Sequence, residues 1–272
     1  MTLARRVMMV LREAAAVLDP ALWSWGMGSV GSLGDGSTTN RSSPVQVGTL
    51  SDWVILSSGG RNSSEGWNQA IKSNGTLWAW GAGPLGNLGL GDTNNRSSPV
   101  QVGSLTTWKS VSAGAAHSFG IQSNGTLWAW GLNSTGQLGQ ISNNTNRSSP
   151  VQIGSLTTWT AVAAGAAHGV ALQSNGTLWT WGTGSSGRLG DGAASNRSSP
   201  VQVGSLTSWV MASGGVQMSA VRADGTIWTW GPNGTGALGD GSTIDRSSPV
   251  QVGSLTSWTN TSTSGTHTLG LR

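Results

Sequence analysis

Apolar positions along the chain follow a pattern that returns about every 50 residues. The string Trp-x-Trp-Gly marks each return, and its copies begin at Trp23, Trp78, Trp128, Trp179 and Trp228. A fixed period of about this length is typical of repeat architectures, in which a residue that recurs in register supports the repeat unit. The pattern therefore predicts a repeat protein whose tryptophans are mainly structural.

Residues 124–172 show how one unit is built. Apolar and polar residues alternate on both sides of Asn124-Gly125, which predicts a hairpin with a type I′ turn. Pro150 is expected to open a further short strand, where a missing N–H is tolerated. With the stretch that follows Trp159, each unit offers about four short strands, as in a β-propeller blade. A solenoid β-helix is the weaker alternative, because its repeats are usually shorter.

The two ends of the sequence carry complementary parts of one unit. The last unit stops at Arg272, before any Trp-x-Trp strand, and a strand of that type lies at residues 21–25 instead. Pairing between these parts would complete a blade and remove a free sheet edge. We therefore expect an all-β propeller of five four-stranded blades over residues 21–272. The N-terminal strand is expected to close it by pairing into the C-terminal blade.

Residues 1–20 do not share the repeat pattern. Val7, Val10, Leu11 and Ala14 recur at helical spacing in a segment rich in good helix formers, which predicts an amphipathic N-terminal arm. A signal peptide is the competing interpretation, although charged residues interrupt its short apolar stretch. The arm is the natural place for attachment to a larger assembly or for oligomerisation.

Composition limits the classes of function. Only 9% of residues are charged, and the chain has 43 Gly, 16 Trp and no Cys, so thiolate chemistry and disulfides are excluded. The formal net charge of +4 comes from basic residues scattered over the repeats, which does not favour nucleic-acid binding. No apolar run approaches the roughly 20 residues of a membrane span.

All three histidines occupy one position of the repeat. His117, His168 and His267 share that position with Trp67 and Gln217 in other units. A histidine that Trp or Gln can replace is most simply a packing residue. Convergence of the three imidazoles on a metal ion is the alternative, but no carboxylate lies beside them in the sequence to orient the rings.

Single aspartates recur in the Gly-rich turns. One Asp per turn is too few for calcium, and we expect each to cap its own turn. An Arg before each Ser-Ser-Pro is expected to reach a neighbouring carbonyl or blade rather than to form a ring of positive charge. These positions are Asp35, Asp92, Asp191 and Asp240, and Arg41, Arg96, Arg147, Arg197 and Arg246.

No catalytic or cofactor-binding residues stand outside the repeat pattern. Gly-rich strings such as residues 182–187 lack the Gly-Lys-Ser/Thr of a phosphate loop, and no Ser-His-Asp set is present. We expect no enzyme activity, cofactor or metal. Individual function is expected where the repeats differ, which is in residues 1–20 and 57–67. The candidate binding residues there are Arg5, Arg6, Arg12, Arg61, Glu65 and Trp67.

The repeat resembles that of the regulator of chromosome condensation family. The resemblance rests on residues 125–139 (GTLWAWGLNSTGQLG), 147–153 (RSSPVQI) and 163–182 (AAGAAHGVALQSNGTLWTWG), and it covers residues 21–272. It implies a propeller of four-stranded blades whose last blade is shared between the chain ends. Familiar members have seven blades, whereas this chain has material for five. They include an exchange factor for a small nuclear GTPase, a plant ultraviolet photoreceptor and a bacterial β-lactamase inhibitor.

The uniformity of the repeats decides between the functions that the resemblance allows. RSSPVQ occurs five times unchanged, which is most similar to uniform-repeat members from bacterial surfaces and phage particles. We expect a non-enzymatic structural or binding module on a virion or extracellular surface, with other proteins, or copies of itself, as partners. The alternative is a regulatory propeller that binds a small GTPase or chromatin. An enzyme or sensor that uses Trp67 or the histidine position is the third possibility.

Overall fold

The chain is built from β-strands and turns throughout the part that the structure describes. The computed structural model describes residues 20–62, 64–140 and 144–272, so the N-terminal arm lies outside it except for Pro20. The helical elements within these ranges are two short 3-10 turns, η2 (Ser29–Gly31) and η3 (Ser185–Gly187). The all-β class predicted from the sequence is confirmed.

Four of the sheets are complete antiparallel blades of four strands in sequential order. Blade 1 contains β3 (Trp53–Gly59), β4 (Trp67–Lys72), β5 (Leu77–Gly81) and β6 (Arg96–Gln101). Blade 2 contains β7 (Trp108–Ala113), β8 (His117–Gln122), β9 (Leu127–Gly131) and β10 (Arg147–Gln152). Blade 3 contains β11 (Trp159–Ala164), β12 (His168–Gln173), β13 (Leu178–Gly182) and β14 (Arg197–Gln202). Blade 4 contains β15 (Trp209–Gly214), β16 (Met218–Arg222), β17 (Ile227–Gly231) and β18 (Arg246–Gln251).

Two further sheets have two strands each and lie at the ends of the array. The N-terminal half-blade contains β1 (Trp23–Gly26) and β2 (Arg41–Gln46), which correspond to the third and fourth strands of a blade. The C-terminal half-blade contains β19 (Asn260–Thr263) and β20 (Thr268–Leu271), which correspond to the first and second. Together they hold the strands of a fifth blade.

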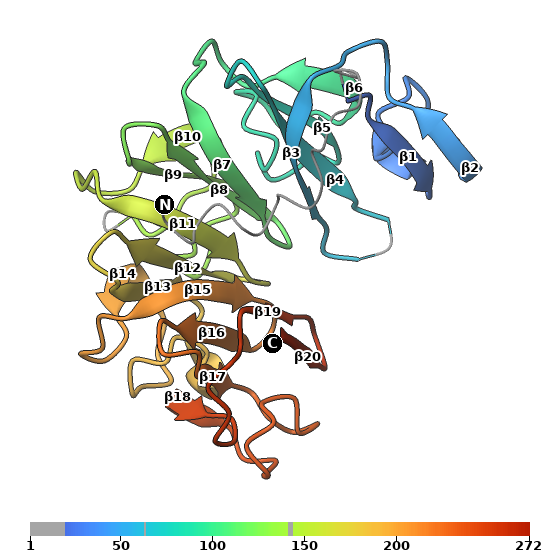
Figure 1. Ribbon diagram of the computed structural model, residues 1–272. Coiled ribbons are helices and arrows are strands. Elements are labelled where there is room, and N and C mark those ends of the chain that lie inside the picture. Colours follow the sequence, from blue (N-terminus) through green and yellow to red (C-terminus); the bar gives the residue numbers. More distant parts are fainter. Residues whose placement is uncertain (1–19, 63, 141–143) are drawn as a thin grey trace, which may run out of the picture.

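The blades form an open crescent rather than a closed ring (Figure 1). First strands of successive blades contact one another along its inner side, and the two half-blades flank its mouth. The closure expected from the sequence is not made here, because β1 pairs with β2, and β20 with β19, but not with each other. The angle between neighbouring blades is fixed by side chains packed between them, and it does not accumulate to a full turn over four blades.

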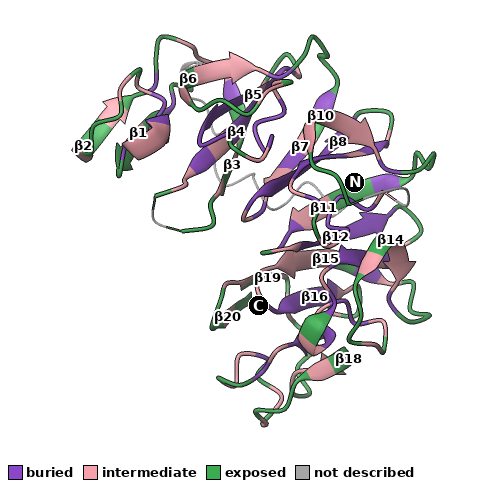
Figure 2. Ribbon diagram, turned by 180° about the vertical axis from the view of Figure 1, so that it is seen from behind, coloured by how far each residue is buried: buried purple, intermediate pink, exposed green. Residues whose placement is uncertain are grey.

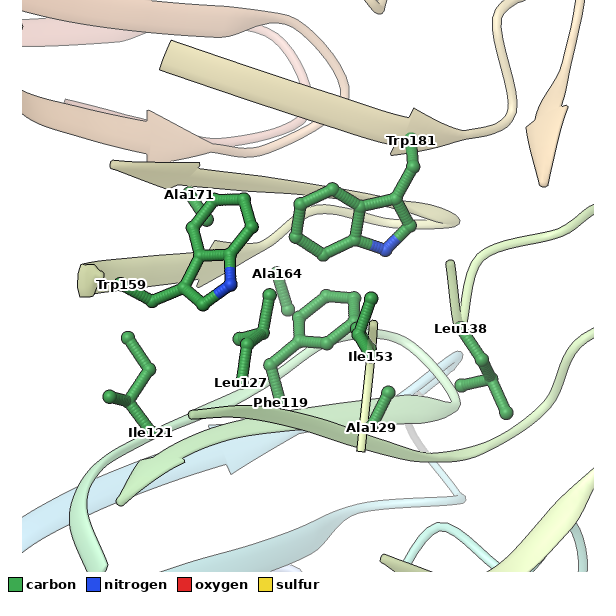
Figure 3. Packing of buried hydrophobic residues seen from close by; sticks show 10 residues of the cluster. All are labelled: Phe119, Ile121, Leu127, Ala129, Leu138, Ile153, Trp159, Ala164, Ala171 and Trp181. Carbon is green, nitrogen blue, oxygen red and sulfur yellow. The ribbon is translucent and has the colours of Figure 1, made fainter. Parts of the chain in front are cut away.

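The hydrophobic core lies between blades as a series of separate clusters. In the cluster of Figure 3, Phe119 of blade 2 packs edge-on against Trp181 of blade 3, with 5.1 Å between ring centroids. Equivalent clusters join the N-terminal half-blade to blade 1, blade 1 to blade 2, and blade 3 to blade 4. Each blade is therefore stabilised by its neighbours, as expected for a quasi-one-dimensional repeat array.

The recurrent tryptophans fill the space over one face of each blade. In blade 4, Trp209 lies at the start of the first strand, and Trp228 and Trp230 lie on the third. The ring centroid of Trp209 is 6.2 Å from that of Trp228 and 6.4 Å from that of Trp230. Such tilted and edge-to-face pairs contribute roughly 0.5–1.5 kcal/mol each beyond the area that they bury. The Trp-x-Trp strings are thus structural, as the repeat pattern predicts.

The Asn-Gly hairpins differ from the predicted type I′ turn. Gly125 has φ +79°, but Asn124 keeps a negative φ, whereas a type I′ turn needs positive φ at both residues. The Gly125 N–H instead donates to the Gln122 carbonyl, and the Asn124 side chain accepts the Thr126 N–H. Gly125 is therefore the left-handed residue that follows the turn, as in a glycine bulge.

Burial is greatest in the middle strands of each blade (Figure 2). All six residues of β8 and of β12 are buried, whereas the fourth strands are half-exposed. Pro150 lies inside the fourth strand β10 and not at its start as predicted. The outermost strand tolerates it because its outer edge donates no ladder hydrogen bonds.

Candidate functional site

The histidine position of the repeat is a packing position. His117 and His168 have no solvent exposure, and Trp67 and Gln217 at the same position are 1% exposed. His267 is exposed because it lies in the C-terminal half-blade. The interpretation of the histidines as packing residues is confirmed for the complete blades.

Burial keeps both inner imidazoles neutral. It lowers the pKa of His117 to about 4, against a smaller opposite effect of the hydrogen bond to the His168 carbonyl. Burial is also the main cause for His168, whose pKa is lowered to about 3, with lesser contributions from Arg188 and from His117 when it is protonated. The His168 ring nitrogen Nε2 lies 2.9 Å from the Met218 sulfur. Within the described ranges, no three His, Asp or Glu side chains gather as metal ligands would.

The recurrent Asp and Arg residues form clamps within the Gly-rich turns. The Asp240 carboxylate is 2% exposed and accepts hydrogen bonds from the Ser242 N–H at 3.0 Å and from Arg246 Nε at 2.7 Å. Asp35 and Asp191 make the same pair of contacts with their own turns and arginines. The capping role predicted for the aspartates is confirmed. Arg41, Arg197 and Arg246 bind these carboxylates, whereas the sequence predicted a neighbouring carbonyl or blade. Arg96 binds Asp92 and also donates to the Asn95 carbonyl, as predicted.

Ion pairing neutralises much of the charge of the chain. The described residues form six ion pairs between side chains. In four of them the cation is the Arg of an Arg-Ser-Ser-Pro string. In blade 2, Gln140 stands where the other turns have an aspartate, and Arg147 Nε donates a hydrogen bond to the Gln140 side-chain oxygen at 3.3 Å. Over the described residues, this pairing leaves fewer free cations to attract the phosphates of a nucleic acid.

Three of the binding residues predicted from the sequence lie around one small hollow. Arg61, Glu65 and Trp67 line it together with residues of the loop after β5, but its volume is about 10 Å³. Trp67 is buried in the cluster between blades 1 and 2. The arrangement brings the three side chains together without room for a ligand. Arg5, Arg6 and Arg12 lie outside the described residues.

A larger groove follows the outer rim where blade 2 meets blade 3. Its volume is about 450 Å³. Leu156, Trp159, Trp179 and Pro200 form its apolar walls, and the side chains of Gln140 and Arg147 stand at its margin. Leu156 is 48% exposed, which is high for a leucine beside two tryptophans. An apolar hollow with a few polar groups at its margin is typical of a binding surface.

The same groove recurs one blade earlier. Leu105, Trp108, Trp128 and Pro150 line a hollow of about 220 Å³ between blades 1 and 2. The leucines at this position of successive repeats are exposed by 36–48%, and they are Leu105, Leu156, Leu206 and Leu255. The sequence analysis did not select them. The only signal was the repeated Gly-Ser-Leu-Thr string, which by itself does not distinguish an exposed leucine from a buried one.

The helices of the described residues include none that is long and apolar enough to cross a membrane.

A comparison with protein families identifies the repeat. The model of the regulator of chromosome condensation (RCC1) repeat matches residues 19–64, 74–121, 124–172, 175–222 and 224–271. A second model of the same repeat matches residues 108–137 and 159–188. The matched ranges cover most of the chain and follow the period of the Trp-x-Trp-Gly strings.

Proteins of known sequence share the repeat at moderate identity. The chain is 31% identical over 188 residues to the ultraviolet-B receptor UVR8 of Arabidopsis thaliana, covering 66% of this chain and 41% of the receptor. It is 32% identical over 179 residues to the human probable E3 ubiquitin-protein ligase HERC6, covering 62% of this chain and 17% of the ligase. The chain therefore spans less than half the length of either relative.

Solved structures share the fold at low identity. Human WBSCR16 superposes with a TM-score of 0.80 at 20% identity, over 93% of this chain and 67% of that one. Prp20p of Saccharomyces cerevisiae, described with its binding properties to Gsp1p and histones, superposes with a TM-score of 0.75 at 20% identity, over 86% and 59%. The chain belongs to the family of regulator of chromosome condensation (RCC1) repeat proteins, and its fold is that of their propellers.

Proposed function

We propose that this chain is a non-enzymatic module that binds a folded protein on the outer rim of its crescent. The observation that carries the proposal is the recurrence of the apolar groove at two successive blade junctions, each with a half-exposed leucine beside two tryptophans. Exposed apolar hollows mark protein-interaction sites, and tryptophans are enriched among the residues that supply binding energy there, without any catalytic group. The rigid blades hold the grooves at a fixed spacing.

The relatives favour a regulatory partner over a virion assembly. Prp20p, whose structure resembles this fold, is described as binding Gsp1p and histones. The net charge of +4 disfavours basic histones, because like charges across an interface repel. We therefore propose a folded partner of neutral or acidic surface, of which a small GTPase is the leading example. A location on a virion or cell surface stays a prediction of the sequence.

The proposal is tested by measuring how the full chain binds a purified small GTPase. Leu105→Asp and Leu156→Asp together place charge in both grooves, and we expect them to weaken binding at least tenfold in biolayer interferometry. The matched control is Val210→Lys, since Val210 is 44% exposed outside the grooves and its repeat counterpart is already Lys109. Equal binding by the groove variant and the control would remove the grooves from the proposal. Absence of binding to any GTPase, with histones bound instead, would favour the chromatin alternative.

A further inference from the structure

The two half-blades are complementary pieces of one blade. In every complete blade the second strand pairs with the third, as β12 pairs with β13. At the C-terminal end of the crescent, β20 is a second strand whose outer edge has no strand beside it within the described residues. At the N-terminal end, β1 is a third strand whose inner edge is likewise free. Each end therefore lacks the two strands that the other end presents.

The N-terminal end exposes apolar side chains that are buried elsewhere in the array. Trp25 is 62% exposed, whereas its repeat counterparts Trp80, Trp130, Trp181 and Trp230 are exposed by at most 3%. Leu56 on the neighbouring strand β3 is 57% exposed, whereas Val111 at the same position of blade 2 is 8% exposed. Both side chains line a hollow of about 270 Å³. The hollow lies where the first two strands of a blade would stand.

The C-terminal end shows the reciprocal exposure. Leu269 is 64% exposed, and residues at its position in the four blades are exposed by at most 1%, namely Gln69, Phe119, Val170 and Ser219. Trp258 is half-buried, and its counterparts Trp53, Trp108, Trp159 and Trp209 are exposed by 3–5%. Trp258 lines a hollow of about 330 Å³ beside β20, where the third and fourth strands of a blade would stand.

We propose that a second copy of this chain completes the split blade, with β20 of one copy pairing antiparallel with β1 of the next. The register follows from β12 and β13, in which Val170 faces Thr180. Transferred to the half-blades, it sets Leu269 opposite Ser24. The same docking brings Trp23 and Trp25 onto Trp258, as Trp228 and Trp230 lie on Trp209 in blade 4.

A second copy fits these edges better than the chain's own opposite end. The half-blades of one chain lie on either side of the mouth of the crescent, and the clusters between blades hold them there. Each copy keeps one edge of each kind, so the contact is heterologous and extends from copy to copy. The expected product is an open-ended series of oligomers.

The intact blades also show which residue pair suits a disulfide test. The Gln173 N–H donates to the Thr177 carbonyl, so these two residues form a hydrogen-bonded pair. Hydrogen-bonded and non-hydrogen-bonded pairs alternate along an antiparallel ladder, which makes Val170 and Thr180 a non-hydrogen-bonded pair. Residues at such a position have Cα atoms about 4.5 Å apart, within the range that a disulfide spans.

The test uses single cysteine substitutions in the full chain, which has no cysteine of its own. Ser24→Cys and Leu269→Cys are purified separately, mixed in a glutathione redox buffer and analysed on non-reducing gels. Ser24→Cys is conservative, and Leu269 is exposed, so both variants should fold, which circular dichroism checks. The matched control replaces Leu269→Cys with Leu255→Cys, because Leu255 is 45% exposed and lies outside both edges.

We expect a disulfide-linked dimer from the mixture at a yield at least tenfold above the Leu255→Cys control. The double variant Ser24→Cys with Leu269→Cys should give a ladder of oligomers. A double variant that oxidises only within single chains would overturn the proposal in favour of closure within one chain. A mixture that gives no dimer above the control would also overturn it. Sedimentation velocity of the unmodified protein adds a readout free of cysteines, in which a mass independent of concentration counts against the proposal.

Discussion

The imidazole Nε2 of His117 in blade 2 lies 3.3 Å from the carbonyl oxygen of His168 in blade 3. Both side chains are fully buried, and His168 in turn contacts Met218 of blade 4. A single position of the repeat thus links three successive blades along the inner side of the crescent. Its residues act through contacts between blades, and burial of the neutral rings makes those contacts sensitive to acid.

Acid should destabilise the crescent through these two histidines. Their pKa values are lowered to about 4 and about 3 in the folded chain, against about 6.5 when unfolded. The unfolded chain therefore binds more protons as the pH falls below about 6.5, and stability is lost down to the folded pKa values. The loss is at most about 1.4 kcal/mol per pH unit for each histidine. Urea unfolding at pH 7, 5.5 and 4.5 measures it.

The variant His168→Gln provides the matched control for this acid effect, because Gln217 holds the same position in blade 4. We expect this variant to fold. Between pH 6.5 and pH 4, its free energy of unfolding should change with pH about half as steeply as that of the unmodified protein. An unchanged slope in this variant would show that the titrating groups lie elsewhere.

Burial should decide how much each Asp-Arg clamp contributes to stability. Asp240 is 2% exposed and accepts hydrogen bonds from Ser242, Arg246 and Asn233, whereas Asp92 in the equivalent turn is 38% exposed. Asp240→Ala removes the charged acceptor of the Ser242 N–H and of Arg246 Nε, and we expect a loss of about 2–3 kcal/mol. Asp92→Ala should cost clearly less, because solvent screens this exposed pair. Similar losses in thermal or urea unfolding would contradict the importance of burial.

The Asp240 clamp should also fail at a lower pH than the histidines. Burial alone would raise the pKa of Asp240, but hydrogen bonds from Arg246 and Ser242 outweigh it and lower the pKa to about 2. Because the folded pKa lies below the unfolded value, the stabilisation is present above about pH 4 and is lost as the pH falls towards 2. Asp240→Asn should remove this second step from an acid titration followed by tryptophan fluorescence, and its persistence would assign the step to other groups.

Two glycines with positive φ allow the cost of backbone strain to be measured separately from the cost of a steric clash. A Cβ at Gly125 would lie 2.1 Å from the Thr157 carbonyl oxygen, whereas a Cβ at Gly103 meets nothing within 4 Å. Gly103→Ala should lower the free energy of unfolding only by the strain of a left-handed alanine, about 1–2 kcal/mol. Gly125→Ala adds displacement of the Thr157 backbone, and we expect about 2–4 kcal/mol in total. Equal losses in urea unfolding would mean that the loop around Thr157 moves freely.

Tryptophans at the same position of the repeat should contribute more to stability in a complete blade than in a half-blade. Trp181 is fully buried in blade 3, and Trp181→Ala should cost about 3–5 kcal/mol. Trp25 is 62% exposed, so Trp25→Ala should cost less than about 1 kcal/mol in dilute protein. Thermal unfolding at low concentration compares the two. A large loss for Trp25→Ala in a monomeric sample would show that the half-blade already buries this ring.

The repeat sequence was sufficient to predict the blades but not several of their details. The period of Trp-x-Trp-Gly, the apolar alternation around Asn124-Gly125 and the turn residues predict four strands per unit, because those patterns reflect local geometry. The conformation of Asn124 was predicted wrongly, since its side chain captures the Thr126 N–H and selects a different turn. The partners of the arginines were also missed, because a spacing of six residues to an aspartate becomes a contact only when the Gly-rich turn folds back.

The sequence by itself determined the all-β class, the repeat, the packing role of the histidines and the capping role of the aspartates. Each of these depends on residues close in the chain or repeated in register. Only the tertiary structure decided that β1 and β20 stay apart and that Leu56, Trp25 and Leu269 are exposed. These features depend on the angle between blades, summed over the array. That angle is set by interlocking side chains such as Phe119 and Trp181, and no pattern within one repeat specifies it.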